Sequence, residues 1–591
     1  MKSTLDTLVQ ETSRLLGSGQ ANEALNRYAL WLQTEQAHPL GHFVWFNYGS
    51  LLQSESLTER AMDAYRACLK LVPGFPPALI NLGLCFEALK SFEQALSCWG
   101  ELTQDEIPTH SELREYFLSA LNHSARLLED LDRLDEATQC LERSLEVDHQ
   151  QTDVVHHWVH VQQKACQWPV YRALQRVRPN QMLLATSPLP MLAISDDPSL
   201  LLLNAREFVR RKWGIEGKQV SKGKRVEQRI RIGYVSGDFC THAVGVLLPE
   251  VIQAHDRMGF EVYAYDYSRE DGSSLRRQLL ACFDQVRSIH GLSDEAAADL
   301  IAQDDVDVLI DLQGISFGAR PRIAACRPAR TQGAWLGFIG TTGMPWIDFV
   351  VTDRYALPSE LELYFTESPL HVAGSFLPLA LKRQNAVAPM SREASGFPND
   401  RLILAALGNV YKITPMMFAA WMRLLQQFPS TLLWLIDDNP TATANLRRAA
   451  DQHGINPSRL LFTARESYPV YLRRLEHAEL FLDSFPYNCG ATARDVVSCG
   501  VPLVSLSGRS MVSRMGGSIL ASIGLDELIA HSIQEYESIA VRLLSDPLAR
   551  EDVRRRLMLA IDRSSIAIED FVRSLESGYR KFLQESESQR A

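Results

Sequence analysis

The chain has 591 residues, and this length predicts two to four domains. Hydrophobic residues make up 46% of it and charged residues 22%, as in an ordinary soluble globular protein. The formal net charge of −11 argues against general nucleic-acid binding, because that function needs a basic surface.

Targeting and membrane segments are not evident. The N-terminal stretch MKSTLDTLVQETSRLL lacks the apolar core of a signal peptide and is predicted to form an amphipathic helix. No apolar run reaches the roughly 18 residues that a membrane span needs. The ten cysteines form no CxxC pair and no Cys/His metal spacing, which is typical of free thiols in a reducing cytoplasm. We therefore expect a cytoplasmic protein without a membrane span.

The first 150 residues repeat with a period of 34. An Asn-x-Gly motif at 47–49 recurs at 81–83, a Glu-x-Ala motif at 59–61 recurs at 93–95, and Tyr65 recurs as Trp99. Weaker copies begin near residues 22 and 135. This period predicts three to four tetratricopeptide hairpins over residues 1–150. Such stacks present a groove for peptides or proteins, although a packing or dimerisation module fits the same pattern.

Residues 151–228 stay helical in character but lose the period, so they are predicted to be a helical linker region. Within them GKQVSKGKRVEQ (217–228) is polar and basic, as in a linker or surface loop.

After residue 228, short apolar runs alternate with helical stretches. One set starts at 229, 261, 306, 331 and 347, and a second set starts at 402, 431, 459, 479 and 501. This alternation predicts two Rossmann-like, doubly wound α/β domains, over 229–385 and 386–565, with ligands at the carboxyl ends of the strands. A last helix, at about 566–585 within 566–591, carries apolar residues at helical spacing and is predicted to pack on the body.

Two common nucleotide motifs are missing. No GxGxxG follows a first strand and no GxxxxGK[ST] occurs, which disfavours dinucleotide dehydrogenases and P-loop enzymes. Asp305 and Asp307 stand at the start of a strand and are interpreted as strand-entry polar residues, so no metal is assigned.

A first polar corner follows the strand RIRIGYV and reads SGDFCTH, ending at His242. A histidine at a strand's carboxyl end is suited to donate to a substrate or relay a proton near neutral pH. On position alone, a structural histidine is an equally good interpretation.

A second corner follows the strand LILAALG. Lys412 stands there, and Thr414-Pro415 supplies the N-cap and the first-turn proline of a helix. A lysine at this place can meet a diphosphate as a point charge, and the alternative is an ordinary surface lysine.

A third corner, SFPYNCGATARD, follows the strand ELFLDS. Gly490 lets backbone approach a ligand, and the helix start at Ala491 and Thr492 offers N–H groups and a hydroxyl. Asp495, one turn further, is placed to accept from ribose hydroxyls. Together these residues predict an anion site.

Read together, these corners resemble the O-linked N-acetylglucosamine transferase family, with its SPINDLY-type and bacterial members. The matching segments are IRIGYVSGDFCTH, residues 318–343, IDFVVTD, GNVYKITP, LFLDSFPYNCGATARDVVSCGVPLVSL and SRMGGSIL. The resemblance covers most of the chain. It implies an N-terminal α-helical tetratricopeptide solenoid followed by a GT-B fold. It also implies inverting transfer of N-acetylglucosamine from UDP-N-acetylglucosamine to protein Ser or Thr, without a cofactor or an essential metal.

The resemblance also assigns roles to residues. Lys412 matches the diphosphate-neutralising lysine, and His242 matches the active-site histidine, as a base or as a binding residue. Asn409 stands where the family has a glutamine that contacts the nucleotide. The other nucleotide-sugar positions are Tyr471 and Arg474 for the base, Asp495 for the ribose, and Asn488, Gly490, Ala491, Thr492, Gly340 and Thr341.

Three residues depart from the family pattern: Ile339 replaces a proline, Ala491 lacks a hydroxyl, and Phe317 replaces a polar residue. The hydroxyl missing at Ala491 removes one hydrogen bond to phosphate, worth about 1.5–3 kcal/mol. Another donor, GDP-fucose or UDP-glucose, and a catalytically decayed repeat scaffold therefore stay open. The expected partners are a nucleotide sugar and a protein acceptor along the repeat groove, and a homo-oligomer is left open.

Overall fold

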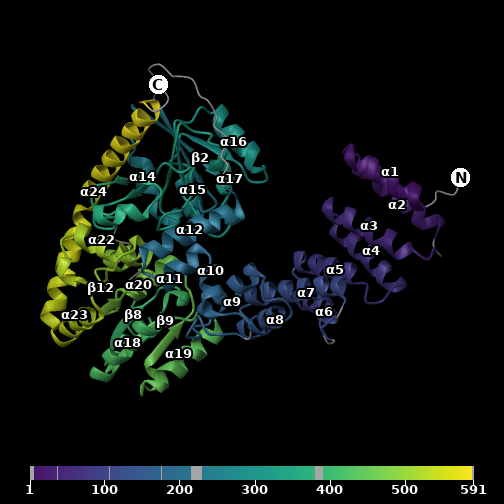
Figure 1. Cartoon of the computed structure of the whole chain (residues 1–591). Helices are drawn as coiled ribbons and strands as arrows, with labels where there is room; N and C mark the ends of the chain where they lie inside the picture. The colour runs from purple at the N-terminus through teal and green to yellow at the C-terminus, as the bar shows by residue number, and fades with distance from the viewer. Residues whose placement is uncertain are drawn as a thin grey trace. The chain divides into compact units, whose positions relative to one another are not determined.

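Figure 1 shows a computed structural model of the chain. It describes residues 5–35, 38–104, 107–108, 110–174, 176–214, 229–379 and 390–588. The chain divides into two compact units, one of Met1–Gln162 with Val170–Ala185 and one of Gln163–Pro169 with Thr186–Ala591. No helix of the described residues is long and apolar enough to cross a membrane.

The first unit begins with four helical hairpins, which confirms the predicted repeats. The hairpins are α1 (Leu5–Gly17) with α2 (Ala21–Thr34), α3 (Gly41–Ser54) with α4 (Thr58–Leu71), α5 (Pro76–Ala88) with α6 (Phe92–Glu101), and α7 (Ser111–Asp130) with α8 (Leu134–Val147). Further helices are α9 (Thr152–Lys164) and α10 (Pro179–Ala185).

The 34-residue period has a packing cause. A Cβ added at Gly49 would lie 2.7 Å from the ring of Tyr65, and one added at Gly83 would lie 2.3 Å from Nε1 of Trp99. Both aromatic side chains are fully buried. Each of these two repeats therefore pairs a glycine on its first helix with a large ring on its second.

Residues of the predicted linker region belong in part to the second unit. Here α11 (Pro188–Ile194) and α12 (Pro198–Lys212) follow one another. The backbone carbonyls of Lys164 and Ala165 accept hydrogen bonds from Asn439 (3.0 Å) and Asn445 (2.8 Å). The polar stretch 217–228 lies outside the described residues.

The first sheet of the second unit is fully parallel, in the order β3-β2-β1-β4-β5-β6-β7. Its strands are β1 (Ile230–Ser236), β2 (Phe260–Asp266), β3 (Gln285–Ser288), β4 (Val308–Asp311), β5 (Thr331–Ala334), β6 (Phe349–Thr352) and β7 (Ser368–His371). The five predicted strands are present. The structure adds β3 and β7, two short strands at the sheet edges with half-exposed side chains.

The second sheet is also parallel, in the order β10-β9-β8-β11-β12-β13. Its strands are β8 (Leu402–Ala406), β9 (Thr431–Ile436), β10 (Leu460–Thr463), β11 (Leu480–Leu482), β12 (Leu503–Leu506) and β13 (Ile529–Ala530). All five predicted strands are present, and β13 is an added two-residue edge strand. The predicted boundary at 385/386 lies outside the described residues.

Helices cover both faces of the first sheet. One face packs against α16 and α17, and the other packs against α13, α14 and the C-terminal helix. The helices of this half are α13 (Ala243–Leu247), α14 (Pro249–Ala254), α15 (Ser274–Leu280), α16 (Asp294–Gln303), α17 (Pro321–Ala325) and the 3-10 helix η1 (Ser359–Tyr364).

The second half follows the same plan. Its α-helices are α18 (Pro415–Gln427), α19 (Pro440–Gln452), α20 (Tyr468–Leu475), α21 (Ala491–Ser498), α22 (Met515–Ser522) and α23 (Ile533–Ser545). The 3-10 helices are η2 (Val410–Lys412), η3 (Pro457–Arg459), η4 (Met511–Arg514) and η5 (Asp526–Leu528).

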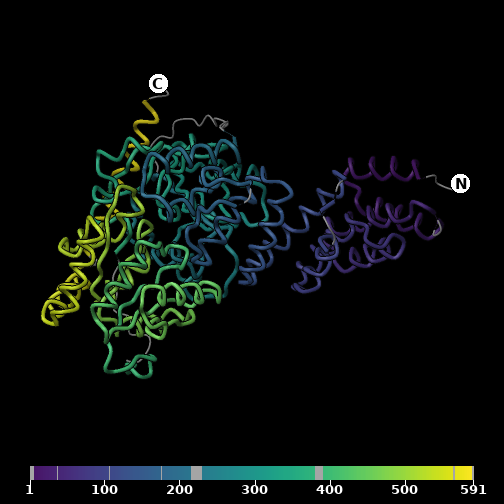
Figure 2. Tube along the Cα trace, turned by 60° about the horizontal axis from the view of Figure 1, so that its bottom comes forward, coloured from purple at the N-terminus to yellow at the C-terminus, as the bar shows by residue number. Residues whose placement is uncertain are grey.

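The C-terminal helix is longer than predicted. It starts at Pro547 rather than near 566 and runs to Ser588 as α24, because no glycine or proline interrupts it before Gly578. It contacts α21 and α23 of the second half and β5, β7 and α14 of the first half. Figures 1 and 2 show it in yellow along both halves. This helix therefore joins the two sheets.

Candidate functional site

The carboxyl ends of the two sheets are where the halves meet. Helix α13, after β1, contacts α21, after β11. Tyr355, after β6, donates a hydrogen bond to Ser507, after β12, over 2.9 Å. In such parallel sheets, loops at these ends carry the ligand sites.

His242 is the N-cap of α13. Its Nδ1 accepts a hydrogen bond from the backbone N–H of Val244 over 3.4 Å, and its side chain is 48% exposed. An accepting Nδ1 has a free lone pair, so the proton of the neutral ring is on Nε2. In this tautomer His242 presents an N–H donor rather than a base.

A carboxylate lies beside the same nitrogen. Asp238 Oδ2 is 3.3 Å from His242 Nδ1, where it would pair with a protonated ring. Gln313 donates to Asp238, and Tyr267 donates to Gln313 over 3.1 Å. The side chains of Asp238 and Gln313 thus support the histidine from the loops after β1 and β4.

Lys412 ends η2, in the corner after β8. Its Nζ lies 3.7 Å from the ring centroid of Tyr487, which comes from the loop after β11. Among the described residues no carboxylate lies within ion-pair distance of this ammonium group. Thr414 caps α18 as predicted and donates to the carbonyl of Phe485 over 3.0 Å. The lysine is thereby held against the third corner with its charge uncompensated.

The loop after β11 is built around the buried carboxylate of Asp483. It accepts from the backbone N–H groups of Ser484 (2.9 Å) and Cys489 (2.7 Å) and from the Ser505 hydroxyl (2.7 Å). Burial raises the pKa of Asp483 to about 6. Asn488 is also buried, and its amide donates to the carbonyl of Ser484 over 2.7 Å. Asn488 therefore shapes the loop.

Helix α21 starts directly after this loop. Its N-cap is Gly490, which supplies no side-chain hydrogen bond, so the first-turn N–H groups at Ala491 and Thr492 have no side-chain cap. Gly408, before Lys412, lies close to Cys489, since a Cβ at Gly408 would be 3.2 Å from its Sγ. The structure thus brings the second and third predicted corners together.

The residues predicted to bind the nucleoside are more buried than Lys412 and the start of α21. Asp495 accepts a hydrogen bond from Tyr468 over 2.6 Å, and burial raises its pKa to about 6. Burial also raises the pKa of Tyr471 well above its ordinary value. Arg474 donates to Glu466 over 2.6 Å and packs over the rings of Phe397 and Trp434.

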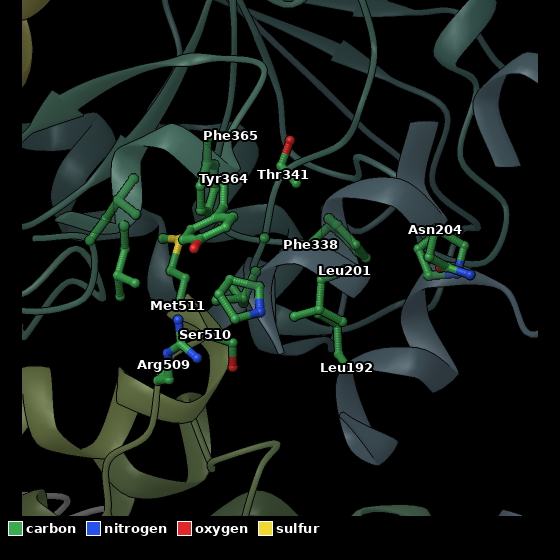
Figure 3. A pocket seen from close by; sticks show the side chains of 16 residues that line it. Leu192, Leu201, Asn204, Phe338, Thr341, Tyr364, Phe365, Arg509, Ser510 and Met511 are labelled. Atoms are coloured by element: carbon green, nitrogen blue, oxygen red, sulfur yellow. The ribbon is translucent and has the colours of Figure 1, made fainter. Parts of the chain in front are cut away.

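Gly340 and Thr341 lie apart from these corners. They line a small pocket with Arg509, Ser510 and Leu192 (Figure 3), whose lining includes neither His242 nor Lys412. The free volume of about 20 Å³ is enough for about one water molecule. Thr341 donates to Glu367 over 2.7 Å.

The residues that depart from the family pattern are also placed by the structure. Ile339 is buried and lines the same small pocket. Phe317 is 98% exposed on the loop after β4.

Within the described residues no three His, Cys, Asp or Glu side chains are grouped to hold a metal ion.

Some residues at the site escape prediction. Asp238 stands four positions before His242, and Tyr468 precedes the predicted Tyr471, so proximity in sequence was the available signal. Gln313 and Arg465 carry no such signal, because their contacts at the site are with residues far away in the sequence.

Two doubly wound parallel sheets that meet at their carboxyl ends, behind a stack of helical hairpins, define a protein of the GT-B class. The family model described as glycosyl transferase family 41 matches residues 192–378 and 380–572, and a tetratricopeptide repeat model matches residues 118–150. The chain belongs to glycosyl transferase family 41.

Named relatives agree with this family. The chain is 30% identical over 376 residues to the probable UDP-N-acetylglucosamine–peptide N-acetylglucosaminyltransferase SEC of Arabidopsis thaliana, covering 61% of this chain and 38% of the relative. It is 29% identical over 367 residues to the protein named SPINDLY of Oryza sativa, covering 60% and 39%. The chain therefore spans about two fifths of the length of these curated relatives.

A solved structure shares the fold. An O-GlcNAc transferase of Thermobaculum terrenum, in mutant form, superposes with a TM-score of 0.69 at 23% identity. The match covers 93% of this chain and 98% of that one. It supports the architecture of helical repeats followed by two Rossmann-like domains.

Proposed function

We propose that this protein transfers N-acetylglucosamine from UDP-N-acetylglucosamine to Ser or Thr of a protein acceptor, with inversion. The observation that carries the proposal is the meeting of Lys412 with the loop before the uncapped start of α21. The names of the relatives, which specify UDP-N-acetylglucosamine and a peptide acceptor, support the choice of substrates.

The chemistry is one in-line displacement. The acceptor oxygen forms a bond to the anomeric carbon while the bond to the diphosphate oxygen breaks, so negative charge grows on the leaving phosphate. The hydroxyl proton passes to His242 Nε2 when that atom is unprotonated, and otherwise to water. Lys412 and the N–H groups of Ala491 and Thr492 stabilise that charge. No metal is needed for this step, since the protein supplies the positive charge.

His242 acts first as a donor in this scheme. With the proton on Nε2, the ring donates a hydrogen bond to a substrate oxygen. Acting as the base requires the proton on Nδ1, next to Asp238, and breaks the cap bond to Val244. For His242 to act as the base, substrate binding must drive the transfer of the ring proton from Nε2 to Nδ1.

In this proposal the tetratricopeptide hairpins bind the protein acceptor. Stacked hairpins of this kind bind peptides or proteins in their groove, which suits a transferase that acts on protein. All ten cysteines are free thiols, which supports a reducing compartment such as the cytoplasm.

The test is donor binding and hydrolysis by the purified protein. UDP-N-acetylglucosamine, UDP-glucose and GDP-fucose are compared, with UDP and GDP alone as controls. Turnover of the N-acetylglucosamine donor with preference for UDP is the expected result. Preference for GDP would keep the fold and replace the sugar, and binding of neither nucleotide would leave a repeat scaffold.

A further inference from the structure

Arg465 joins three loops at the carboxyl end of the second sheet. It stands after β10, and its Nη2 donates to Asn409 Oδ1, after β8, over 2.6 Å. The same nitrogen pairs with Asp438 Oδ1, after β9, over 2.9 Å. None of the matching family segments includes Arg465.

The contact fixes which way the Asn409 amide points. A guanidinium group has only donors, so the atom facing Arg465 must be the amide oxygen. The amide nitrogen then faces away, and no hydrogen-bond partner for it occurs in the part of the chain that the structure describes. Asn409 is the N-cap of η2, three residues before Lys412. An N–H₂ donor is therefore offered on the same turn as the lysine.

Apart from these two contacts, Arg465 contributes little to the stability of the fold. Its side chain is 58% exposed and that of Asp438 is 24% exposed. Exposed ion pairs of this kind contribute only about 0–1 kcal/mol to folding. Removal of Arg465 should therefore change the orientation of Asn409 without unfolding the domain.

We propose that Arg465 is a positioning residue for the donor nucleotide. It holds the Asn409 amide so that Nδ2 donates to an acceptor oxygen of the nucleotide, on phosphate or on a carbonyl group. The proposal rests on the proposed function, which places a nucleoside diphosphate at this corner.

Two substitutions of Arg465 distinguish loss of its hydrogen bond to Asn409 from a reversed orientation of the Asn409 amide. Arg465→Met removes the donor and lets the amide rotate freely. Arg465→Glu places an acceptor there, which attracts Nδ2 and turns Oδ1 towards the nucleotide. Arg448 offers a matched control, because it is another exposed arginine that donates to an asparagine, Asn445, over 2.8 Å, outside this corner.

UDP binding to the full chain, measured by calorimetry, provides the readout, with GDP used if the wild type prefers it. We expect about tenfold weaker binding for Arg465→Met, the size of one hydrogen bond to a charged group. Binding should be weaker still for Arg465→Glu. Arg448→Met and Arg448→Glu should stay within twofold of the wild type, and midpoints of thermal unfolding should stay within about 2 °C for Arg465→Met.

A double-mutant cycle with Asn409→Ala decides the mechanism. If Arg465 acts through Asn409, Arg465→Met costs less than twofold in the Asn409→Ala background. The same tenfold loss in both backgrounds would mean that Arg465 touches the nucleotide itself and would overturn the proposal. Unchanged binding by Arg465→Met would overturn it too. A wild type that binds neither UDP nor GDP overturns the proposed function as well.

Discussion

Two buried carboxylates at the carboxyl end of the second sheet have the same raised pKa and different surroundings. Asp483 accepts three hydrogen bonds within its own neighbourhood, so its oxygens are committed to the loop. Asp495 accepts from Tyr468 through one oxygen, Oδ1. Burial raises both pKa values to about 6, although the hydrogen bonds that each carboxylate accepts lower its pKa. The number of donors, rather than the pKa, distinguishes the structural carboxylate from the one suited to meet a ribose.

Tyr468→Phe should raise the pH below which UDP binding weakens. The Tyr468 hydroxyl stabilises the ionised carboxylate, so its removal raises the pKa of Asp495 above about 6. Since the ionised form is the better acceptor for ribose hydroxyls, binding should weaken at a higher pH than in the wild type. Calorimetry from about pH 5 to 8 measures this, with Asp495→Asn giving the titration of the nucleotide phosphate alone. Coincident wild-type and variant profiles would contradict the assignment of Asp495.

Lys412→Ala tests the proposed role of Lys412 in stabilising the leaving diphosphate. Loss of a preorganised charge at the leaving group should lower kcat/KM for the donor about 100- to 1,000-fold. Lys412→Arg should retain part of the activity, and Lys581→Ala, an exposed lysine on α24, serves as the control. A Lys412→Ala enzyme as active as the wild type would remove the lysine from the mechanism.

At the scale of elements, the repeat helices show how a small residue is dictated by its partner. Gly83 leaves room for Trp99, whose indole N–H donates to the carbonyl of Ile80 over 3.2 Å. Any side chain at this position of α5 must displace a fully buried ring. The glycine is therefore needed for helix packing and not for a turn.

Gly83→Ala should destabilise the repeat unit by about 1–3 kcal/mol, because the added methyl group overpacks the interface. Gly100→Ala in α6 is the matched control, since a Cβ there meets no atom within 4 Å. That substitution should be neutral or gain up to about 1 kcal/mol from helix propensity. Chemical denaturation of the full chain compares the two, and equal effects would show that the close approach to Trp99 is tolerated.

For the whole molecule, residues 186–212 connect the two halves of the second unit. Asp196 accepts hydrogen bonds from the backbone of Arg509 (2.7 Å) and Ser510 (2.9 Å) and from the Ser513 hydroxyl (2.6 Å), all in the second half. On the other side, a Cβ at Gly343 of the first half would lie 2.7 Å from the backbone of Arg206 in α12. This segment, like α24, therefore contacts both halves.

Asp196→Ala should lower the free energy of unfolding by about 3 kcal/mol, because several donors lose a charged acceptor. Its neighbour Asp197 is the N-cap of α12 and accepts from the N–H of Ser199 over 2.9 Å. Asp197→Ala should cost only about 1 kcal/mol, the usual value of a cap. Thermal unfolding of both variants tests the difference, and a larger loss for Asp197→Ala would refute the connecting role of Asp196.

The sequence by itself determined the features that repeat or have a local period. The 34-residue spacing predicted the helical hairpins, and the apolar runs predicted ten strands, because burial imposes a pattern on neighbouring residues. It also placed Lys412 and the start of α21 at strand ends. The edge strands β3, β7 and β13 were missed, because β3 and β7 are short and half-exposed and the buried β13 has only two residues, too few to carry a pattern.

Only the tertiary structure decided which distant residues meet. It assigned residues 163–169 and 186–212 to the second unit, placed Tyr487 under Lys412, and packed Arg474 between Phe397 and Trp434. It also connected Arg465 to Asn409 across 56 positions of sequence. Hydrogen bonds and ring contacts of this kind depend on where strands and helices stack, and no periodicity in the chain records them.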